Sequence, residues 1–409
     1  MKVFGCAWHL LLVVALACSV CARAAAVAEI VPQQPIVILL SWDGMRHDYA
    51  ARGEFPGLQR LDTEGLRAQR LHTVMPSTTF PGHVSMATGT YPDRHGIVDN
   101  RFLDRKRGQY SYSSDADWLQ AEPLWIAAER QGVPTATYFW VGSESDWHGQ
   151  RSRYRIAPFD GERPEAQKVD QILAWLSLPE GQRPRLIMSY WAGVDSIGHY
   201  YGPNSDRVAE QIGRQDEQLV RLLDGLDALQ LWSRTTLLLV SDHGMTVTGK
   251  YLDLAGALAA GGISARLFGG ALVQVHVAEA AQIAAAGRII RTFPQATVYD
   301  GSRLPAAFRL RHPTRTGDWV AVVPPPFTFA CSAGVTGQLQ SLLYAAGWDY
   351  GAHGYDPALA DMAGVFYALG RGVEPNLSLG EVHQIDIAAT VSRLLGIDPP
   401  LQSEGVPIL

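Results

Sequence analysis

Three short apolar runs are the clearest pattern in the sequence, and they cover Pro35–Leu40, Arg185–Tyr190 and Thr235–Val240. Continuous apolar runs of this length are typical of strands that are buried on both faces of a parallel sheet. Segments with helical periodicity lie between the runs. The longest is Ser205–Leu231, where apolar residues recur about every 3.6 positions. The alternation predicts an α/β sandwich with helices on both faces of a mostly parallel sheet.

The pattern changes between residues 250 and 349. Ala271–Val277 alternates like a strand, Ala280–Phe293 is an alanine-rich helical segment, and Trp319–Val323 predicts a further strand. The alternation of strands and helices resumes after this region, with a predicted strand at Met362–Leu369 and a predicted helix at Gln384–Leu395. We therefore expect residues 33–249 and 350–409 to form the two parts of a core, and residues 250–349 to form an inserted cap subdomain.

Residues 1–25 have the features of an export signal. A basic start at Lys2 precedes an almost wholly apolar run from Cys6 to Val20, and small residues suited to cleavage follow it. The run is shorter than the roughly 20 residues of a membrane span, although an uncleaved anchor is the alternative. We expect a periplasmic or secreted protein with a cleaved signal peptide and no membrane span. Cleavage would leave Cys331 as the only cysteine, which excludes an intramolecular disulfide.

Composition excludes one class of partner. The 409 residues have a formal net charge of −6, whereas a general nucleic-acid coat needs a basic face. We therefore expect no stable nucleic-acid partner. A small phosphorylated substrate stays possible, because bound metal dications would dominate the local field.

Acidic residues and histidines follow the predicted strands or lie in glycine-containing loops. Ligand sites of open α/β sheets form beyond the carboxyl ends of the strands, so these side chains should meet at one edge. Each group by itself also has an ordinary explanation, such as a helix cap, a polar turn or a surface histidine. Together their oxygen and nitrogen donors suit zinc. The candidate ligands are Asp43, Asp195, His199, Asp242, His243 and His353.

Thr79 is the candidate nucleophile. A threonine hydroxyl is a poor nucleophile at neutral pH until a metal ion coordinates it and displaces its proton. Pro81 predicts a helix start, which would place Thr79 at a helix N-terminus where a phosphate is favoured. The alternative is that Thr78 or Thr79 only caps the helix. Asn100 could donate its amide hydrogens to a phosphoryl oxygen without adding charge.

With these residues in place, the sequence resembles the nucleotide pyrophosphatase/phosphodiesterase family of the alkaline phosphatase superfamily, in its bacterial exported form. The motifs that match are SWDGMRHDY, MPSTTFPGHVSMATGTYPDRHGIVDN, PLWIAAERQG, FWVGSE, DSIGHYYGP, SDHGM and HGYDP. They extend from about Ile36 to Leu395. The resemblance implies an alkaline-phosphatase-like three-layer sandwich with an inserted cap.

The resemblance also implies roles for individual residues. Thr79 would be the nucleophile and would contact one of two Zn²⁺ ions per chain, which Asp43, Asp242 and His243 also hold. Asp195, His199 and His353 would hold the second ion. Asn100 would contact a phosphoryl oxygen, and the substrate-binding residues would be Phe80, Phe159 and Tyr190, with phenylalanine at 159 where relatives often have a tyrosine.

The implied reaction forms a phospho-threonine intermediate and gives a 5′-nucleotide. Three alternatives stay open: a phosphomonoesterase, a phospholipid-type phosphodiesterase, and an inactive metal-binding module. A monoesterase would place cations near the phosphate, and Arg151, Arg153 and Arg155 are the candidates for such a role. The preferred base, the leaving group and the oligomeric state are left open.

Overall fold

The computed structural model describes residues 34–331, 339, 342–348 and 350–409. The predicted signal peptide at residues 1–25 lies outside this part of the chain. In the described part, no helix combines the length and the apolar composition that crossing a bilayer requires.

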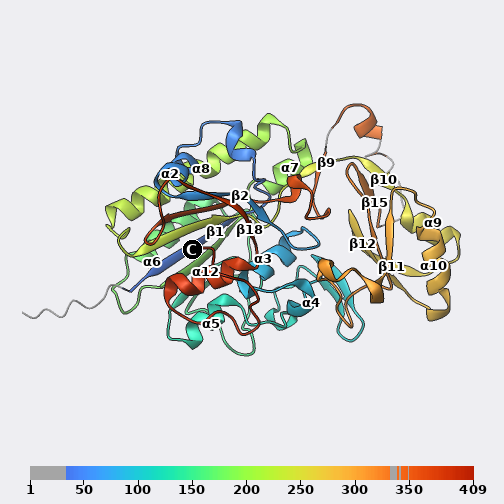
Figure 1. Cartoon of the computed structure of the whole chain (residues 1–409), viewed down its shortest axis with the longest axis horizontal. Helices are drawn as coiled ribbons and strands as arrows, with labels where there is room; N and C mark the ends of the chain where they lie inside the picture. Colours follow the sequence, from blue (N-terminus) through green and yellow to red (C-terminus); the bar gives the residue numbers. More distant parts are fainter. Residues whose placement is uncertain (1–33, 332–338, 340–341, 349) are drawn as a thin grey trace, which may run out of the picture. The chain divides into compact units, whose positions relative to one another are not determined.

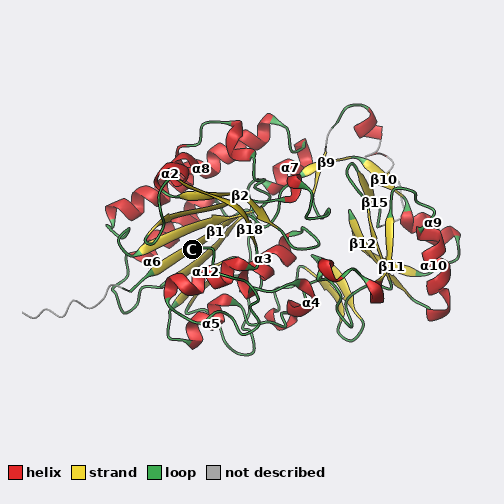
Figure 2. Ribbon diagram, viewed as in Figure 1, coloured by secondary structure: helices red, strands yellow, loops and turns green. Residues whose placement is uncertain are grey.

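An eight-stranded sheet forms the centre of the described chain (Figures 1 and 2). All its pairings are parallel except those of one strand, which runs antiparallel to both neighbours. This confirms the prediction of a mostly parallel sheet. Across the sheet the strands are β18 (Leu377–His383), β2 (Leu66–His72), the antiparallel β17 (Phe366–Gly370), β8 (Thr235–Val240), β1 (Ile36–Trp42), β7 (Leu186–Trp191), β5 (Thr135–Tyr138) and β6 (Tyr154–Ile156).

Helices cover both faces of this sheet and make it the middle of three layers. Successive strand residues point to opposite faces, so Ile38 and Leu40 of β1 belong to one core and Val37 and Leu39 to the other. The first core packs under α2 (Pro56–Glu64), α6 (Glu165–Leu176) and α8 (Asp206–Ala228). The second packs under α3 (Thr79–Thr88), α5 (Leu124–Arg130) and α12 (Asp386–Leu395).

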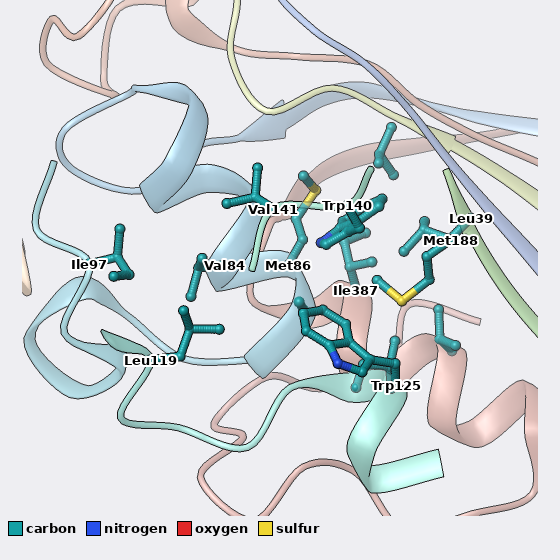
Figure 3. Packing of buried hydrophobic residues seen from close by; sticks show 14 of the residues in the cluster. Leu39, Val84, Met86, Ile97, Leu119, Trp125, Trp140, Val141, Met188 and Ile387 are labelled. Carbon is teal, nitrogen blue, oxygen red and sulfur yellow. The ribbon is translucent and has the colours of Figure 1, made fainter. Parts of the chain in front are cut away.

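The second core fixes the position of α3. Val84 and Met86 of this helix pack with Leu39 of β1, Trp125 of α5 and Ile387 of α12, as Figure 3 shows. All residues of α3 from Pro81 to Thr88 are buried. Such a helix cannot rotate or slide without opening cavities in the core, so its first residue is held firmly against the sheet.

The helices largely follow the predicted pattern. In α8 the apolar stripe, including Val208 and Ile212, is buried, and the Ser205 side chain accepts a hydrogen bond from the Arg207 amide. The helix ends at Ala228, before the expected Leu231. The strand predicted at Met362–Leu369 was wrong in its first residues. Met362 is the last residue of a 3₁₀ turn over Ala360–Met362, and strand β17 starts only at Phe366.

A second, antiparallel sheet lies within residues 250–349. Its strands are ordered β11 (Ala265–Gly269), β12 (Leu272–Val277), β14 (Trp319–Val322) and β13 (Thr297–Asp300). Its own apolar core contains residues of α9 (Leu254–Ala260) and α10 (Ile283–Ile290). The helix expected at Ala280–Phe293 is shorter than predicted, because it covers only Ile283–Ile290. A 3₁₀ turn over Ala280–Gln282 precedes it. The exact bounds of the cap subdomain stay a prediction.

Short elements complete the surroundings of the site. Three two-stranded sheets and two short helices connect the main elements. The strand pairs are β3 (Arg101–Asp104) with β4 (Gly108–Ser111), β9 (Thr246–Thr248) with β16 (Tyr350–Ala352), and β10 (Lys250–Leu252) with β15 (Phe327–Phe329), and the helices are α4 (Pro92–His95) and α7 (Asp195–Tyr201).

Candidate metal centre and active site

The six predicted metal ligands meet at one edge of the central sheet. Asp43 follows β1, Asp195 begins the helix after β7, and Asp242 follows β8. These three strands are adjacent and parallel, so their carboxyl ends lie side by side. His243 Nε2 lies 3.3 Å from both Asp43 Oδ1 and Asp242 Oδ2. Asp195 Oδ1 lies 3.3 Å from His199 Nε2 and 3.6 Å from His353 Nε2.

Two groups of side chains within this cluster have ligand atoms that lie within 4.8 Å of one another. One group is Asp43, Asp242 and His243, as predicted for the first metal ion. The other is Asp195, His243 and His353, whereas the family resemblance assigns His199 rather than His243 to the second ion. The rings of His243 and His353 are stacked, with centroids 3.6 Å apart. His243 therefore lies between the two groups, and the predicted division of ligands stays a prediction.

The three histidines are oriented alike. Nδ1 of His199 lies 2.9 Å from the Gly351 carbonyl, Nδ1 of His243 2.9 Å from the Gly244 carbonyl, and Nδ1 of His353 3.0 Å from the Ser77 carbonyl. A carbonyl only accepts hydrogen bonds, so each Nδ1 carries a proton, and in the neutral form of each ring Nε2 would present a lone pair. Donation from the second ring nitrogen is the usual support for a metal-ligating histidine.

Unsatisfied carboxylate oxygens show that the cluster fits metal ions. Asp43 Oδ1, Asp195 Oδ1 and Asp242 Oδ2 are buried and have no hydrogen-bond partner. A buried carboxylate oxygen without a partner is costly, and a cation would compensate for that cost. Burial, together with the charges of Asp242 and Asp195, raises the pKa of Asp43 well above its ordinary value. The donor set and the crowded charge thus suit divalent cations.

Glycine permits the close approach of the ligand segments at two positions. A Cβ atom on Gly44 would lie 2.9 Å from Asp195 Cα, and Gly44 has a positive φ of 70°. A Cβ atom on Gly244 would lie 2.1 Å from the Asp361 carbonyl oxygen. Since any side chain would push these segments apart, both glycines are needed to keep the ligands together.

Thr79 is the first residue of α3 and faces the cluster. Its Oγ1 atom lies 3.2 Å from His243 Nε2. Thr78 occupies the N-cap position, but its side chain makes no capping bond and instead donates weakly to Asp99 Oδ1 over 3.4 Å. Neither threonine side chain caps the helix. The Thr79 hydroxyl is thus available for chemistry at a helix N-terminus, which favours an anion.

Asn100 is oriented by the same helix. Its Oδ1 atom accepts a 2.8 Å hydrogen bond from the Phe80 amide. Because the carbonyl side of the Asn100 amide is occupied in this way, its NH₂ group is the side left to donate. The side chain borders the same cavity as Thr79, so it can hydrogen-bond an oxygen of a group placed over Thr79.

An aromatic cavity of about 530 Å³ opens beside the cluster. All three predicted substrate-binding aromatic residues line it, namely Phe80, Phe159 and Tyr190. The Phe159 ring contacts Tyr190 with centroids 5.9 Å apart. Phe80 makes an edge contact with Tyr112, which sequence reasoning did not single out. Aromatic walls of this kind suit a flat ring such as a nucleobase.

Tyr190 has a second contact that ties the cavity to the metal ligands. Its hydroxyl donates a 2.6 Å hydrogen bond to Asp43 Oδ2. Burial and the Asp43 charge raise the pKa of Tyr190 well above its ordinary value, so the phenol keeps its proton and remains a donor. The hydrogen bond orients the Asp43 carboxylate so that Oδ1 faces His243.

Sequence reasoning missed two buried residues behind the cluster. His83 Nδ1 donates to the Thr79 carbonyl over 2.8 Å, and His83 Nε2 accepts from Ser41 Oγ, also over 2.8 Å. Gln384 Nε2 donates to the Asp242 carbonyl over 2.6 Å, and its Oε1 accepts from the Val74 amide. The four-residue spacing of Thr79 and His83 in a helix was the one available signal. For Gln384, sequence spacing offered none.

In sequence, the chain is similar to known pyrophosphatases and phosphodiesterases. A family model for type I phosphodiesterase / nucleotide pyrophosphatase matches residues 37–356. An uncharacterized pyrophosphatase/phosphodiesterase of Schizosaccharomyces pombe is 36% identical over 222 residues, which are 53% of this chain and 46% of that protein. Human ectonucleotide pyrophosphatase/phosphodiesterase family member 1 is 36% identical over 221 residues, which are 52% of this chain and 24% of that protein. The matched part thus spans about half of the yeast protein and a quarter of the human one.

The fold is also that of a solved relative. The structure of inactive murine ectonucleotide pyrophosphatase/phosphodiesterase 5 in complex with AMP matches with a TM-score of 0.82 at 24% identity. The match covers 91% of this chain and 97% of that chain. It confirms the expected alkaline-phosphatase-like architecture. Because the family model spans most of the sequence, the chain belongs to the type I phosphodiesterase / nucleotide pyrophosphatase family.

Proposed function

We propose that this chain is an exported two-zinc phosphodiesterase that hydrolyses nucleotide phosphoanhydrides or phosphodiesters and releases a 5′-nucleotide. The observation that supports this most directly is the position of the Thr79 hydroxyl, 3.2 Å from His243 Nε2 and beside an aromatic cavity. Relatives are named as pyrophosphatases and phosphodiesterases, and the murine structural neighbour was solved with AMP. The apolar run in residues 6–20 supports export to the periplasm or the medium.

Seven side chains would hold the metal ions. Asp43, Asp242, His243 and Thr79 would surround the first, and Asp195, His199 and His353 the second. When bound, two divalent cations supply Lewis-acid chemistry that lowers the pKa of an alcohol and stabilises charge on a leaving oxygen. The unpartnered carboxylate oxygens and the shared orientation of the three histidines support this assignment.

Thr79 would attack phosphorus in the first half of the reaction. A bond forms between Thr79 Oγ1 and phosphorus, and the bond from phosphorus to the leaving oxygen breaks with its electron pair going to that oxygen. The threonine gives up one proton, and the leaving group takes one up. In the second half water cleaves the phospho-threonine bond and restores the hydroxyl. Asn100 would donate to a non-bridging oxygen as charge develops there.

The walls of the aromatic cavity favour a diester over a monoester. No arginine or lysine is among the described residues that line it. A phosphomonoester carries an additional negative charge, and sites for monoesters tend to meet this charge with a cation. Of the three arginines named above, Arg155 is engaged with Asp146 at 2.7 Å. Lys168 lies behind the cavity and donates to the Tyr190 carbonyl. The aromatic walls also suit a base better than a lipid chain.

Turnover of two chromogenic esters tests the proposal. The zinc-loaded protein should hydrolyse p-nitrophenyl thymidine 5′-monophosphate much faster than p-nitrophenyl phosphate. Dominant turnover of the monoester would contradict the substrate class and favour the phosphomonoesterase. Dominant turnover of a phosphocholine ester would favour the phospholipid-type enzyme. A protein that binds two metal ions but hydrolyses none of these esters would instead be an inactive metal-binding module.

A further inference from the structure

His83 lies where the proposed nucleophile and the metal ligands meet, but no step described above uses it. It follows Thr79 by one turn of α3, and its side chain is completely buried. The ring makes edge contacts with Trp140 and Tyr190, with centroids 5.2 Å away in both cases. A buried polar ring needs a partner for each nitrogen, so the identity of these partners shows which segments His83 holds together.

Both ring nitrogens of His83 contact segments of the site. Nδ1 donates a 2.8 Å hydrogen bond to the Thr79 carbonyl, which can only accept. Burial lowers the pKa of His83 and so favours the neutral ring. In that form Nε2 accepts a 2.8 Å hydrogen bond from Ser41 Oγ. One ring thus connects the peptide group of Thr79 to β1, the strand that Asp43 follows.

The same ring also lies against Asp242. His83 Nδ1 is 3.4 Å from Asp242 Oδ2, the oxygen that lies 3.3 Å from His243 Nε2. Glycine at position 82 lets α3 come this near, because a Cβ atom there would lie 2.9 Å from the Asp242 carbonyl oxygen. His83 therefore contacts three segments that are far apart in the sequence and that carry the nucleophile and two of the proposed ligands.

The first turn of α3 is held less by apolar packing than the rest of the helix. Residues 81–88 are buried, whereas Thr79 and Phe80 are only partly buried and border the aromatic cavity. Apolar packing has no preferred direction, while a hydrogen bond fixes both distance and angle. The His83 ring thus gives the Thr79 peptide group a directional contact at the end of the helix where packing is weakest.

We infer that His83 is a positioning residue, which fixes Thr79 for attack on phosphorus by joining the first turn of α3 to β1. This inference rests on the proposed function and adds a residue to its mechanism. His83 is not among the residues that line the aromatic cavity, so it acts through Thr79 and not on the substrate. A misplacement of the attacking atom by about 1 Å can lower a rate about 100-fold. Loss of the His83 contacts should therefore lower kcat and leave KM unchanged.

Three substitutions separate the contacts of His83. His83→Phe keeps an aromatic ring but removes both hydrogen bonds, and we expect kcat for p-nitrophenyl thymidine 5′-monophosphate to fall about 10- to 100-fold. The amide nitrogen of asparagine can take the place of Nδ1, so His83→Asn should restore most of kcat. The longer side chain of His83→Gln extends toward Ser41 and should restore less. KM and the zinc content should stay close to wild type in all three variants.

His95 provides the matched control. It is as buried as His83, and its Nε2 also contacts a serine hydroxyl, that of Ser85 over 2.9 Å. Its Nδ1 accepts from the Ile97 amide instead of holding Thr79, and it does not line the aromatic cavity. His95→Phe should lower the Tm as His83→Phe does, but kcat of the folded protein should remain at the wild-type value.

Several results would contradict the positioning role. They are a wild-type kcat in His83→Phe, an equal fall of kcat in His95→Phe, and a higher KM with unchanged kcat. Loss of zinc from His83→Phe would also contradict it, because the ring would then support the ligands instead of Thr79. If His83→Phe does not fold, equal kcat values in His83→Asn and His83→Gln would overturn the inference. A wild-type protein that does not hydrolyse the thymidine ester would instead contradict the proposed function itself.

Discussion

The metal-ligand cluster and the aromatic cavity meet at Thr79, but they are built in different ways. Asp43, Asp242 and His243 are almost completely buried and lie just after the ends of two adjacent strands of the central sheet. Among the residues that line the aromatic cavity, Phe159 is 46% exposed and Tyr112 is 49% exposed, and both lie outside the central sheet. The sheet therefore fixes the positions of the proposed ligands, while exposed residues outside the sheet form part of the wall of the aromatic cavity.

Loss of the nucleophile should have the largest effect. In Thr79→Ala we expect the kcat for p-nitrophenyl thymidine 5′-monophosphate to fall by about 10⁴-fold or more, as is usual when a covalent nucleophile is removed. Zinc content, measured by mass spectrometry, should persist because six other ligands remain. Thr79→Ser, which keeps a hydroxyl, should retain part of the activity. Unchanged turnover in Thr79→Ala would remove the nucleophile assignment.

Removing the metal ions should destabilise the fold around the ligand cluster rather than around the aromatic cavity. Chelation would leave three crowded carboxylates without cations, and restoring zinc at 100 times its Kd should stabilise the fold by about 2.7 kcal/mol. A thermal melt should therefore show a higher Tm with zinc than with EDTA. The double variant Asp242→Asn, Asp195→Asn should lose this difference. An identical Tm in both conditions for the wild type would argue against metal ions as part of the folded site.

Gln384 tests whether a residue outside the proposed ligand set helps to hold the cluster in position. Gln384→Ala removes the bond to the Asp242 carbonyl, and we expect zinc affinity to fall by about 10- to 100-fold, the usual cost of losing a residue that positions a metal ligand. Competition with a chromogenic chelator measures this directly. Gln274→Ala is the matched control, because Gln274 is equally buried and also contacts backbone groups, but near the second sheet. Equal losses in both variants would indicate general destabilisation.

The smallest effect is expected at the edge of the aromatic cavity. Phe159→Ala should raise KM for the thymidine ester about tenfold, as the loss of one stacking face implies, with kcat little changed. Phe159→Tyr preserves the ring and should remain close to wild type in steady-state kinetics. A fall in kcat with unchanged KM would place Phe159 in the reaction rather than in substrate binding.

Sequence patterns were sufficient to predict the position of a residue where that position depends only on the segment that contains it. The run Ile36–Leu40 is apolar throughout because β1 is buried on both faces, and Asp43 directly follows the end of this strand at Trp42. Ligands at strand ends could therefore be predicted together with the sheet. The start of β17 could not be, because the hydrophobic Met362 is buried by a 3₁₀ turn rather than by a strand.

Long-range contacts explain what the sequence concealed. Gln384 reaches Asp242 across 142 positions, and Tyr190 reaches Asp43 across 147. No local periodicity encodes such pairs, since they arise only when the strands assemble. The central position of His243 between the two ligand groups is of the same kind. Local patterns thus indicated the candidate ligands, but they did not give the network of hydrogen bonds that orients them.

The central claim is that seven side chains hold two divalent metal ions beside the Thr79 hydroxyl. X-ray diffraction from zinc-loaded crystals, recorded on both sides of the zinc absorption edge, tests it most directly. We expect two anomalous peaks, one contacting Asp43 and Asp242 and the other contacting Asp195 and His353. A cluster without anomalous density, or zinc bound only elsewhere on the chain, would contradict the account.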